Sequence, residues 1–504
     1  MTGDKTSVAS QEFITAIRTI TERGAFAGAR FGIAAHDIGD GSAIYECNAH
    51  EIFLGASTTK ILTSAYALAL LGPDFRFRTR IVRCGMLDDS GTLHGDIILV
   101  ASGDPNLSGR VTSRDTLDFQ DLDHGCAGPK ARLVERNPLQ IIEKLARGVR
   151  DAGIRRVTGT LLVDVHLFGE RHGEPRFMTT MISPVAVNDN QIDIEVTAGA
   201  EPGDPLSYRL LPACGYLRLI DRATTGASDS GPTLRLSGEQ HELDGTQSVV
   251  ITGTVPAGSR SMATIEVERP SRFARTLLIE ALAVAGVVVE RGLFGPDVTA
   301  QVTPADAVTI VEHVSPPLVE ATKIVLKVSQ NYHAEMLIPL IGATLRGARG
   351  TDAVPAGYQC GADLLARWGV DATGAFQGDA CGAHGYFSPA FMCRLLVRIA
   401  ASDIYDALLV GLPIMGRNGT LWDIQPQSPA AGYVAAKTGT MYFDNRLHNT
   451  VLFTSKALAG YVTAKSGRRI AFTIYLNNFH AAPSPDANPG QALGEVATAI
   501  YEHL

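Results

Sequence analysis

Several signatures of common protein classes are missing from this 504-residue chain. Its seven cysteines include no CxxC pair, and its thirteen histidines form no HExxH or similarly spaced cluster, so the sequence contains no recognisable zinc motif. Seven cysteines are too few for a disulfide scaffold of this length, and the odd number leaves at least one thiol unpaired within a monomer. We interpret His124, His172 and His384 as loop residues, and we expect neither a metal nor an organic cofactor.

The chain also lacks runs of lysine and arginine and long apolar segments. Its net charge of −8 is spread along the sequence, which argues against a nucleic acid or an anionic membrane as a partner. No apolar stretch approaches the roughly 18 to 20 residues that cross a bilayer, and residues 1–7 lack the apolar core of a signal peptide. With 45% apolar and 19% charged residues, we expect a folded, soluble protein of several domains.

The first candidate catalytic motif is Ser57-Thr-Thr-Lys60, at the predicted start of an apolar helix that Gly72-Pro73 would end. Residues three apart share a helix face, so the two side chains can meet. Lys60 could take the serine proton if its amine were partly neutral, which a helix N-terminus and a second cation would favour. A capping serine followed by a solvated lysine has the same pattern, so this motif alone is not decisive.

A second candidate motif is Ser329 and Asn331, in the predicted tight connection between a helix over 317–326 and a helix over 332–345. A loop held by two helices can support active-site groups rigidly. Serine and asparagine are also ordinary turn and capping residues, which is the simpler interpretation of this pair by itself.

The third motif, Lys-Thr-Gly-Thr, occupies Lys437, Thr438, Gly439 and Thr440, on or at the end of a predicted strand. The missing side chain of Gly439 would let a substrate lie close against that strand. A solvated lysine at the end of a strand, followed by a turn, is the alternative. Beyond the motif the pattern predicts antiparallel strands at 450–454, 458–462 and 469–476, and a helix over about 491–504.

The rest of the chain predicts a mixture of helices and short strands. A helix over 11–22 and a hairpin at 31–36 and 43–46 precede Ser57. Residues 166–254 are rich in glycine, proline, threonine and valine and predict a small β-rich insertion. Further helices are predicted at 138–152 and 273–285, and further strands at 157–163, 192–196, 248–252 and 287–289.

Taken in order, the three motifs resemble the S-x-x-K, S-x-N and K-T-G set of penicillin-recognising serine enzymes. The separation of 272 positions from Ser57 to Ser329 makes the resemblance closest to the D-alanyl-D-alanine carboxypeptidase/endopeptidase family, the class C low-molecular-mass penicillin-binding proteins. The resemblance covers about residues 25 to 500. It includes the stretches Gly95–Pro105, Ser183–Asn190, Val267–Pro270, Ser315–Leu318 and Leu412–Leu421.

The resemblance implies an α/β (α+β) transpeptidase/β-lactamase-like domain, an antiparallel sheet flanked by helices, with two nested, mainly β inserted domains. We expect the catalytic domain at 1–79 and 302–504. The inserted domain II would comprise 80–165 and 255–301, and the nested β-rich domain III would comprise 166–254.

The resemblance also implies a serine-type D-Ala-D-Ala carboxypeptidase or endopeptidase that acts on peptidoglycan peptides through an acyl-enzyme on Ser57. β-Lactams would acylate the same serine. Lys60 would take the serine proton, Ser329 would pass a proton to the leaving amine, and Asn331 would position Lys60 or the substrate amide.

On the substrate side, the resemblance assigns positive potential for the substrate carboxylate to Lys437, which would also favour the neutral form of Lys60. Thr438 and Thr440 would donate hydrogen bonds to that carboxylate. The backbone N–H groups of Ser57 and Thr440 would form the oxyanion hole.

Two departures and two alternatives accompany this prediction. In the segment 379–385 only the Asp and the second Gly of the family's Asp-Gly-Ser-Gly-Leu-Ser remain, so its role in substrate contact is open and a Cys381/His384 thiol site is conceivable. The family implies a periplasmic or extracellular location, although no export signal is visible. The alternatives are another serine acyl hydrolase on this scaffold (an esterase, a D-amino-acid peptidase or a β-lactamase) and a non-catalytic peptidoglycan-binding protein.

Overall fold

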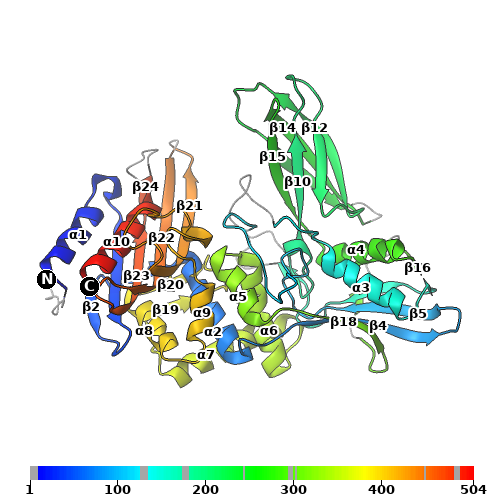
Figure 1. The fold of residues 1–504 in the computed structure, drawn as a ribbon, viewed down its shortest axis with the longest axis horizontal. Coiled ribbons are helices and arrows are strands. Elements are labelled where there is room, and N and C mark those ends of the chain that lie inside the picture. The colour runs from blue at the N-terminus through cyan, green and yellow to red at the C-terminus, as the bar shows by residue number, and fades with distance from the viewer. Residues whose placement is uncertain are drawn as a thin grey trace.

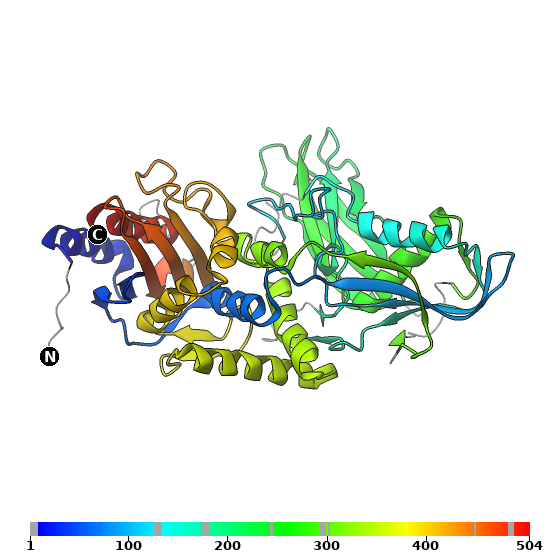
Figure 2. The same cartoon turned by 60° about the horizontal axis from the view of Figure 1, so that its bottom comes forward.

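The computed structural model describes residues 9–124, 134–172, 181–241, 245–292, 299–300, 303–447, 450–481 and 488–504. The N-terminal segment 1–7 discussed above lies outside these residues. The molecule is elongated, with both termini at one end and the segments coloured from cyan to green at the other (Figures 1 and 2).

The helices are α1 (Gln11–Thr21), α2 (Thr59–Leu71), α3 (Gln140–Asp151), α4 (Pro270–Val284), α5 (Leu318–Lys327), α6 (Asn331–Arg346), α7 (Ala353–Trp368), α8 (Pro389–Ala400), α9 (Tyr405–Gly411) and α10 (Pro489–His503).

The sheet at the terminal end has the order β2-β1-β23-β22-β21, with β24 also paired to β22, and all of its pairs are antiparallel. Its strands are β1 (Arg30–Asp37), β2 (Ala43–Cys47), β21 (Val434–Asn445), β22 (Thr450–Thr463), β23 (Arg469–Asn477) and β24 (Phe479–Ala481). The prediction of separate strands at 450–454 and 458–462 is wrong. These residues form one strand, because β22 stays paired with β21 along nearly its whole length, interrupted by one irregularity.

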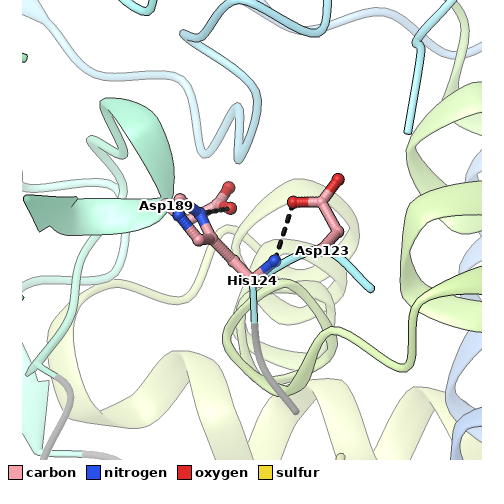
Figure 3. Close-up of side chains that lie close together, drawn as sticks. All are labelled: Asp123, His124 and Asp189. Carbon is pink, nitrogen blue, oxygen red and sulfur yellow. Dashed lines mark hydrogen bonds and ion pairs between the residues drawn. The ribbon is translucent and has the colours of Figure 1, made fainter. Parts of the chain in front are cut away.

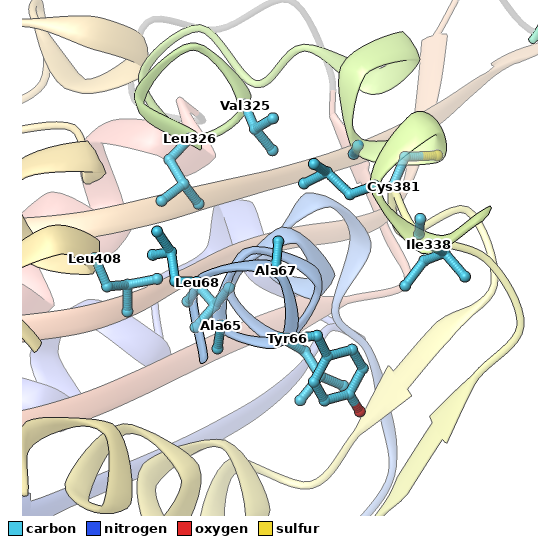
Figure 4. Packing of buried hydrophobic residues seen from close by; sticks show 14 of the residues in the cluster. Ala65, Tyr66, Ala67, Leu68, Val325, Leu326, Ile338, Cys381 and Leu408 are labelled. Carbon is cyan, nitrogen blue, oxygen red and sulfur yellow. The ribbon is translucent and has the colours of Figure 1, made fainter. Parts of the chain in front are cut away.

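Helices cover both faces of this sheet. The pair α1 and α10 packs on one face, and α8 packs against β1 and β23. Helix α2 is buried among α5, α6, α7 and α9, and every residue from Thr59 to Leu68 is buried. In Figure 4, Leu68 of this helix lies beside Leu326 and Leu408, whereas Tyr66 points to the opposite side of the helix. A helix that is apolar all round is expected at the centre of a domain, so the Ser57 segment leads directly into the core.

The residues between α2 and α5 form sheets of their own. The seven-stranded sheet contains β4 (Arg78–Leu87), β5 (Thr92–Val100), β6 (Arg156–Val157), β7 (Leu161–Asp164), β16 (Val288–Val289), β17 (Thr299–Ala300) and β18 (Val308–Val314). The strand predicted over 157–163 is therefore two short strands, β6 and β7. Parallel pairs such as β5 with β6 and β5 with β7 occur here, in contrast to the antiparallel sheet at the terminal end.

Two three-stranded sheets project from this region (Figure 1). One contains β10 (Gln191–Thr197), β11 (Ser207–Leu211) and β15 (Arg260–Glu266), and the other contains β12 (Leu217–Gly226), β13 (Arg235–His241) and β14 (Gln247–Pro256). Their buried apolar residues belong to the same cluster as the seven-stranded sheet and are separate from the cores around α2 and the terminal sheet. The domain boundaries that the resemblance implies stay predictions.

The remaining strands are short. β3 (Phe53–Leu54) pairs with β20 (Gly385–Phe387), which pairs with β19 (Ala375–Gln377), and β8 (Arg171–His172) pairs with β9 (Met181–Ile182). Within the described residues, no helix is both long and apolar enough to span a bilayer.

Candidate active site

Ser57 lies in a 3-10 turn over Ala56–Thr58, directly before α2, which begins two residues later than the predicted helix. The preceding residue, Ala56, has a φ of 44°, a left-handed conformation that residues other than glycine adopt rarely. The hydroxyl of Thr58 donates to the carbonyl of Gly55 at 2.7 Å and helps to hold the turn. Such backbone conformations persist where the surroundings enforce them, frequently at active sites.

The buried ammonium of Lys60 donates to three acceptors from three different parts of the chain. Its Nζ lies 2.8 Å from Ser57 Oγ, 2.6 Å from Asn331 Oδ1 and 2.8 Å from the carbonyl oxygen of Cys381. Three acceptors match the three N–H groups of an ammonium and hold Nζ within proton-transfer distance of the serine hydroxyl. Because acceptors favour the charged amine, an additional influence has to favour the neutral form before Lys60 can act as a base.

The second motif divides between a connection and a helix. Asn331 is the first residue of α6 instead of lying in the connection, and Ser329 occupies the connection, buried, with a φ of 61°. The side chain of Gln330 caps α6 by accepting from the backbone N–H of Tyr332 at 3.0 Å. Asn331 therefore approaches Lys60 from the start of a rigid helix.

The third motif lies on β21, the edge strand of the terminal sheet, against the Ser57 turn. A Cβ atom at Gly439 would lie 2.5 Å from the carbonyl oxygen of Gly55 and 3.3 Å from the Cβ of Ala56. The missing side chain thus lets β21 approach the turn that contains Ser57. This differs from the predicted reason, which was the approach of a substrate.

We expect Gly439→Ala to slow acylation of Ser57 at least about tenfold and to destabilise the protein by about 1–3 kcal/mol. The added methyl group would meet backbone at Gly55, which cannot rotate away as a side chain can. The measurements are the labelling rate with a fluorescent penicillin and the thermal midpoint. Gly231→Ala is the matched control, since a Cβ there meets nothing within 4 Å. A wild-type labelling rate in Gly439→Ala would contradict this role.

Two residues next to β21 were not identified from the sequence. Thr420 and Thr438 place their hydroxyl oxygens 2.7 Å apart, and Lys456 Nζ donates to Thr440 Oγ1 at 2.9 Å. Lys437 is buried, and its Nζ donates to the carbonyl of Thr438 at 2.9 Å. Thr420 lies in the stretch 412–421, one of those that resemble the family, so the sequence contains a signal for it. The sequence contains no such signal for Lys456, because its position beside Thr440 depends on the pairing of β21 with β22. The effect of Lys437 on Lys60 stays a prediction.

The segment 379–385 lies against Lys60 and provides one of its acceptors, the Cys381 carbonyl. The carboxylate of Asp379 accepts backbone N–H groups of the loop, among them those of Cys381 at 3.0 Å and Ala383 at 3.2 Å. Glu335 Oε1 also accepts from Cys381 N at 3.0 Å. The hydrogen bonds to Asp379 hold the loop so that the carbonyl oxygen of Cys381 accepts from Lys60. Because this contact uses a backbone group, no residue type in the sequence predicts it.

The environment of Cys381 argues against the thiol alternative. Burial, together with the nearby carboxylate of Glu335, raises the pKa of the Cys381 thiol well above its ordinary value. The thiolate is the nucleophilic form, so this cysteine stays protonated and unreactive at neutral pH. His384 lies half exposed with Nδ1 3.6 Å from Asp379 Oδ2.

Glu335 makes stability depend on pH. Burial and the neighbouring Asp379 raise the pKa of Glu335 to about 7. As pH rises from about 4.5, the carboxyl ionises in the unfolded chain before it does so in the folded protein, so stability falls until about pH 7 and then levels off. At about 1.4 kcal/mol per pH unit, the loss is about 3 kcal/mol.

In Glu335→Gln we expect this loss to disappear, because the amide stays neutral and its oxygen can still accept from the loop. Urea unfolding between pH 5 and 8 measures the effect. The pKa of buried Asp104 is also raised, to about 7, so the difference between variant and wild type isolates Glu335. Parallel stability profiles of the two proteins would contradict the assignment.

Comparison with known proteins identifies the family. The family model for D-Ala-D-Ala carboxypeptidase 3 (S13) matches residues 14–497. The chain belongs to this family. As a member of the S13 peptidases it is a hydrolase, and the resemblance seen in the motifs is confirmed.

Similar proteins have related descriptions. A D-alanyl-D-alanine carboxypeptidase of Actinomadura sp. strain R39 is 30% identical over 493 residues, which cover 93% of this chain and 81% of that protein. The D-alanyl-D-alanine carboxypeptidase DacB of Haemophilus influenzae is 23% identical over 496 residues, 95% of this chain and 91% of that protein.

The solved structures confirm the expected fold class. Penicillin binding protein 4 (dacB) from Haemophilus influenzae superposes with a TM-score of 0.71 at 19% identity, covering 96% of this chain and 98% of that chain. A second structure of that protein, complexed with a β-lactam, has the same TM-score at 20% identity. The catalytic roles of the eight predicted site residues stay predictions, although Lys60 is in direct contact with both Ser57 and Asn331.

Proposed function

We propose that this member of the D-Ala-D-Ala carboxypeptidase family cleaves the terminal D-Ala-D-Ala bond of peptidoglycan peptides through an acyl-enzyme on Ser57. The contact between Lys60 Nζ and Ser57 Oγ at 2.8 Å carries the proposal. The lysine is buried and held by Asn331 and by the Cys381 carbonyl, so the proton acceptor is pre-positioned against the hydroxyl.

In the first half-reaction, Ser57 Oγ attacks the peptide carbonyl while its proton moves to Lys60, which must be neutral at that moment. The backbone N–H groups of Ser57 and Thr440 stabilise the oxyanion, and one such donor typically contributes about 10²–10³-fold in rate. The tetrahedral intermediate collapses, the C–N bond breaks, and the proton that Lys60 took from Ser57 passes through the Ser329 hydroxyl to the departing amine of D-alanine. Water then attacks the ester and restores the free serine.

The substrate carboxylate would lie along β21. Lys437, a residue of this strand, would contribute positive charge, and the hydroxyls of Thr438 and Thr440 would donate to the carboxylate. Their neighbours Thr420 and Lys456 extend the polar surface.

β-Lactams would react at the same serine, since their strained amide and carboxylate resemble those of the peptide. A related penicillin binding protein 4 is described in complex with a β-lactam. Because peptidoglycan lies outside the cytoplasm, we propose a periplasmic or extracellular location.

The proposal is tested by mass spectrometry of the protein after incubation with a penicillin. We expect one covalent adduct, and peptide mapping should place it on Ser57. In parallel, a peptide ending in D-Ala-D-Ala should release D-alanine faster than its L-Ala-L-Ala counterpart. Rapid turnover of simple esters or of the β-lactam, without D-alanine release, would instead indicate a related acyl hydrolase. Muropeptide binding without any adduct would indicate a non-catalytic protein.

A further inference from the structure

A buried network of charged side chains joins the inserted region to helix α6, close to the candidate active site. Asp189 lies at its centre, and Figure 3 shows its contact with His124. Its Oδ1 accepts from Arg110 Nη1 at 2.6 Å and from His333 Nε2 at 2.8 Å, and its Oδ2 accepts from His124 Nδ1 at 2.7 Å. The side chains of all four residues are at most 5% exposed.

Two further carboxylates extend the network, one beside Arg110 and one beside His124. Arg110 Nη2 lies 2.7 Å from Asp123 Oδ1, and His124 Nε2 lies 2.9 Å from Asp193 Oδ1. Burial would lower the pKa of His124, but the carboxylates of Asp193 and Asp189 outweigh it and raise that pKa to about 10. His124 is therefore a cation at neutral pH.

Burial would raise the pKa of Asp189, but Arg110 and His333 keep it well below its ordinary value, and burial lowers the pKa of His333 itself. At neutral pH the network thus contains ionised Asp189 and a neutral His333 that donates to it. Asp123, His124 and Asp189 also have atoms close enough for a cation site. Their hydrogen bonds to one another and to Arg110 indicate an ion-pair network instead.

The network meets α6 at its first turn. His333 follows Asn331 by two residues, and the residues around Asn331 contact the inserted region as well. The hydroxyl of Tyr332 accepts from Asn190 Nδ2 at 2.7 Å, and Gln330 Nε2 donates to the carbonyl of His124 at 3.4 Å. The position of Asn331 therefore depends on partners more than 140 residues away in sequence.

The segment that provides these partners has an unusual backbone. Asn188, Asp189 and Asn190 all have positive φ, at 50°, 57° and 51°. Consecutive left-handed residues are unfavourable for amino acids other than glycine. The side-chain contacts of Asp189 and Asn190 account for their stability, and they turn both side chains towards α6.

We propose that Asp189, acting through His333, is a positioning residue for catalysis: it holds the first turn of α6 so that Asn331 Oδ1 meets Lys60 Nζ. In this view the inserted region is part of the catalytic apparatus and does more than extend the surface. The proposal rests on the proposed function, because it assigns a role through Asn331 and Lys60. A misplacement of about 1 Å at such a site can reduce the rate about 10²-fold.

The test compares variants by the rate of acylation with a fluorescent penicillin at saturating and at lower concentrations, together with the thermal midpoint. His333→Phe keeps a ring but removes the donor to Asp189. We expect its saturating acylation rate to fall about 10- to 100-fold, with the half-saturating concentration unchanged within about twofold. His333→Gln retains an N–H donor of similar reach, and we expect it to restore the rate to within about threefold of wild type.

Tyr332→Phe is a second test variant. It removes only the hydroxyl that accepts from Asn190 and keeps the packing of the ring. We expect a smaller loss, about three- to tenfold. Tyr216→Phe is its matched control. Tyr216 is also buried, and its hydroxyl accepts from the backbone N–H of Arg269 at 3.2 Å within the inserted region. This control should lower the thermal midpoint to a similar extent without changing the acylation rate.

The outcomes are distinct. If wild type is labelled at Ser57 and folded His333→Phe and Tyr332→Phe are labelled at the same rate, the positioning role is wrong while the proposed function stands. If His333→Phe does not fold, Tyr332→Phe decides the question alone against Tyr216→Phe. Equal rate losses in Tyr332→Phe and Tyr216→Phe would show a general effect of destabilisation and overturn the proposal. An unlabelled wild type would overturn the proposed function and this inference together.

Discussion

Ser57→Ala should eliminate covalent labelling by penicillin and lower the release of D-alanine by at least about 10⁴-fold, since removal of a catalytic serine usually leaves only the effects of binding and the oxyanion hole. The hydroxyl is the atom that Lys60 contacts. Its removal leaves the buried lysine with two other acceptors, so we expect the fold to persist. Labelling kinetics, the D-alanine assay and the thermal midpoint measure the three effects.

Ser64→Ala is the matched control for this variant. Ser64 lies in helix α2, which follows the Ser57 turn, is fully buried, and its hydroxyl has no hydrogen-bond partner within the described structure. We expect Ser64→Ala to be labelled at the wild-type rate. Labelling that persists in Ser57→Ala would show that another residue is the nucleophile.

Lys60→Met should lower the acylation rate about 10²–10⁴-fold, the usual contribution of a general base. Methionine has nearly the length of the lysine side chain but neither accepts the serine proton nor donates to Asn331 and the Cys381 carbonyl. Those two groups lose a buried partner, so the thermal midpoint should fall as well. Stopped-flow labelling over a range of penicillin concentrations separates the rate of acylation from affinity.

We expect the half-saturating penicillin concentration of Lys60→Met to change far less than the rate, because Lys437 and Thr438 are intact. Lys323→Met is the control for removal of a lysine. Lys323 forms an ion pair with Glu320 within α5 and lies outside the proposed machinery. If the two variants are acylated equally fast, Lys60 is not the proton acceptor.

Local patterns predicted most of the elements that surround the site. The apolar periodicity after Ser57, the two helices on either side of Ser329, and the strand with the Lys-Thr-Gly motif are all present in the structure. These patterns are short-range, because side-chain spacing along a helix or strand is set by backbone geometry alone. Predictions failed where a neighbouring strand decided the outcome, as in the single strand β22 that was expected to be two.

The sequence by itself therefore determined most of the elements around the site, the three ordered motifs and, through them, the family. Only the tertiary structure decided how Lys60 is held. Its partners Asn331 and Cys381 lie 271 and 321 residues away, and one of them is a backbone carbonyl, which any residue type provides. The role of Gly439 and the network around Asp189 likewise depend on contacts between distant segments. The physical reason is that hydrogen bonds and close packing act through space, whereas sequence patterns report only the periodicity of a single segment.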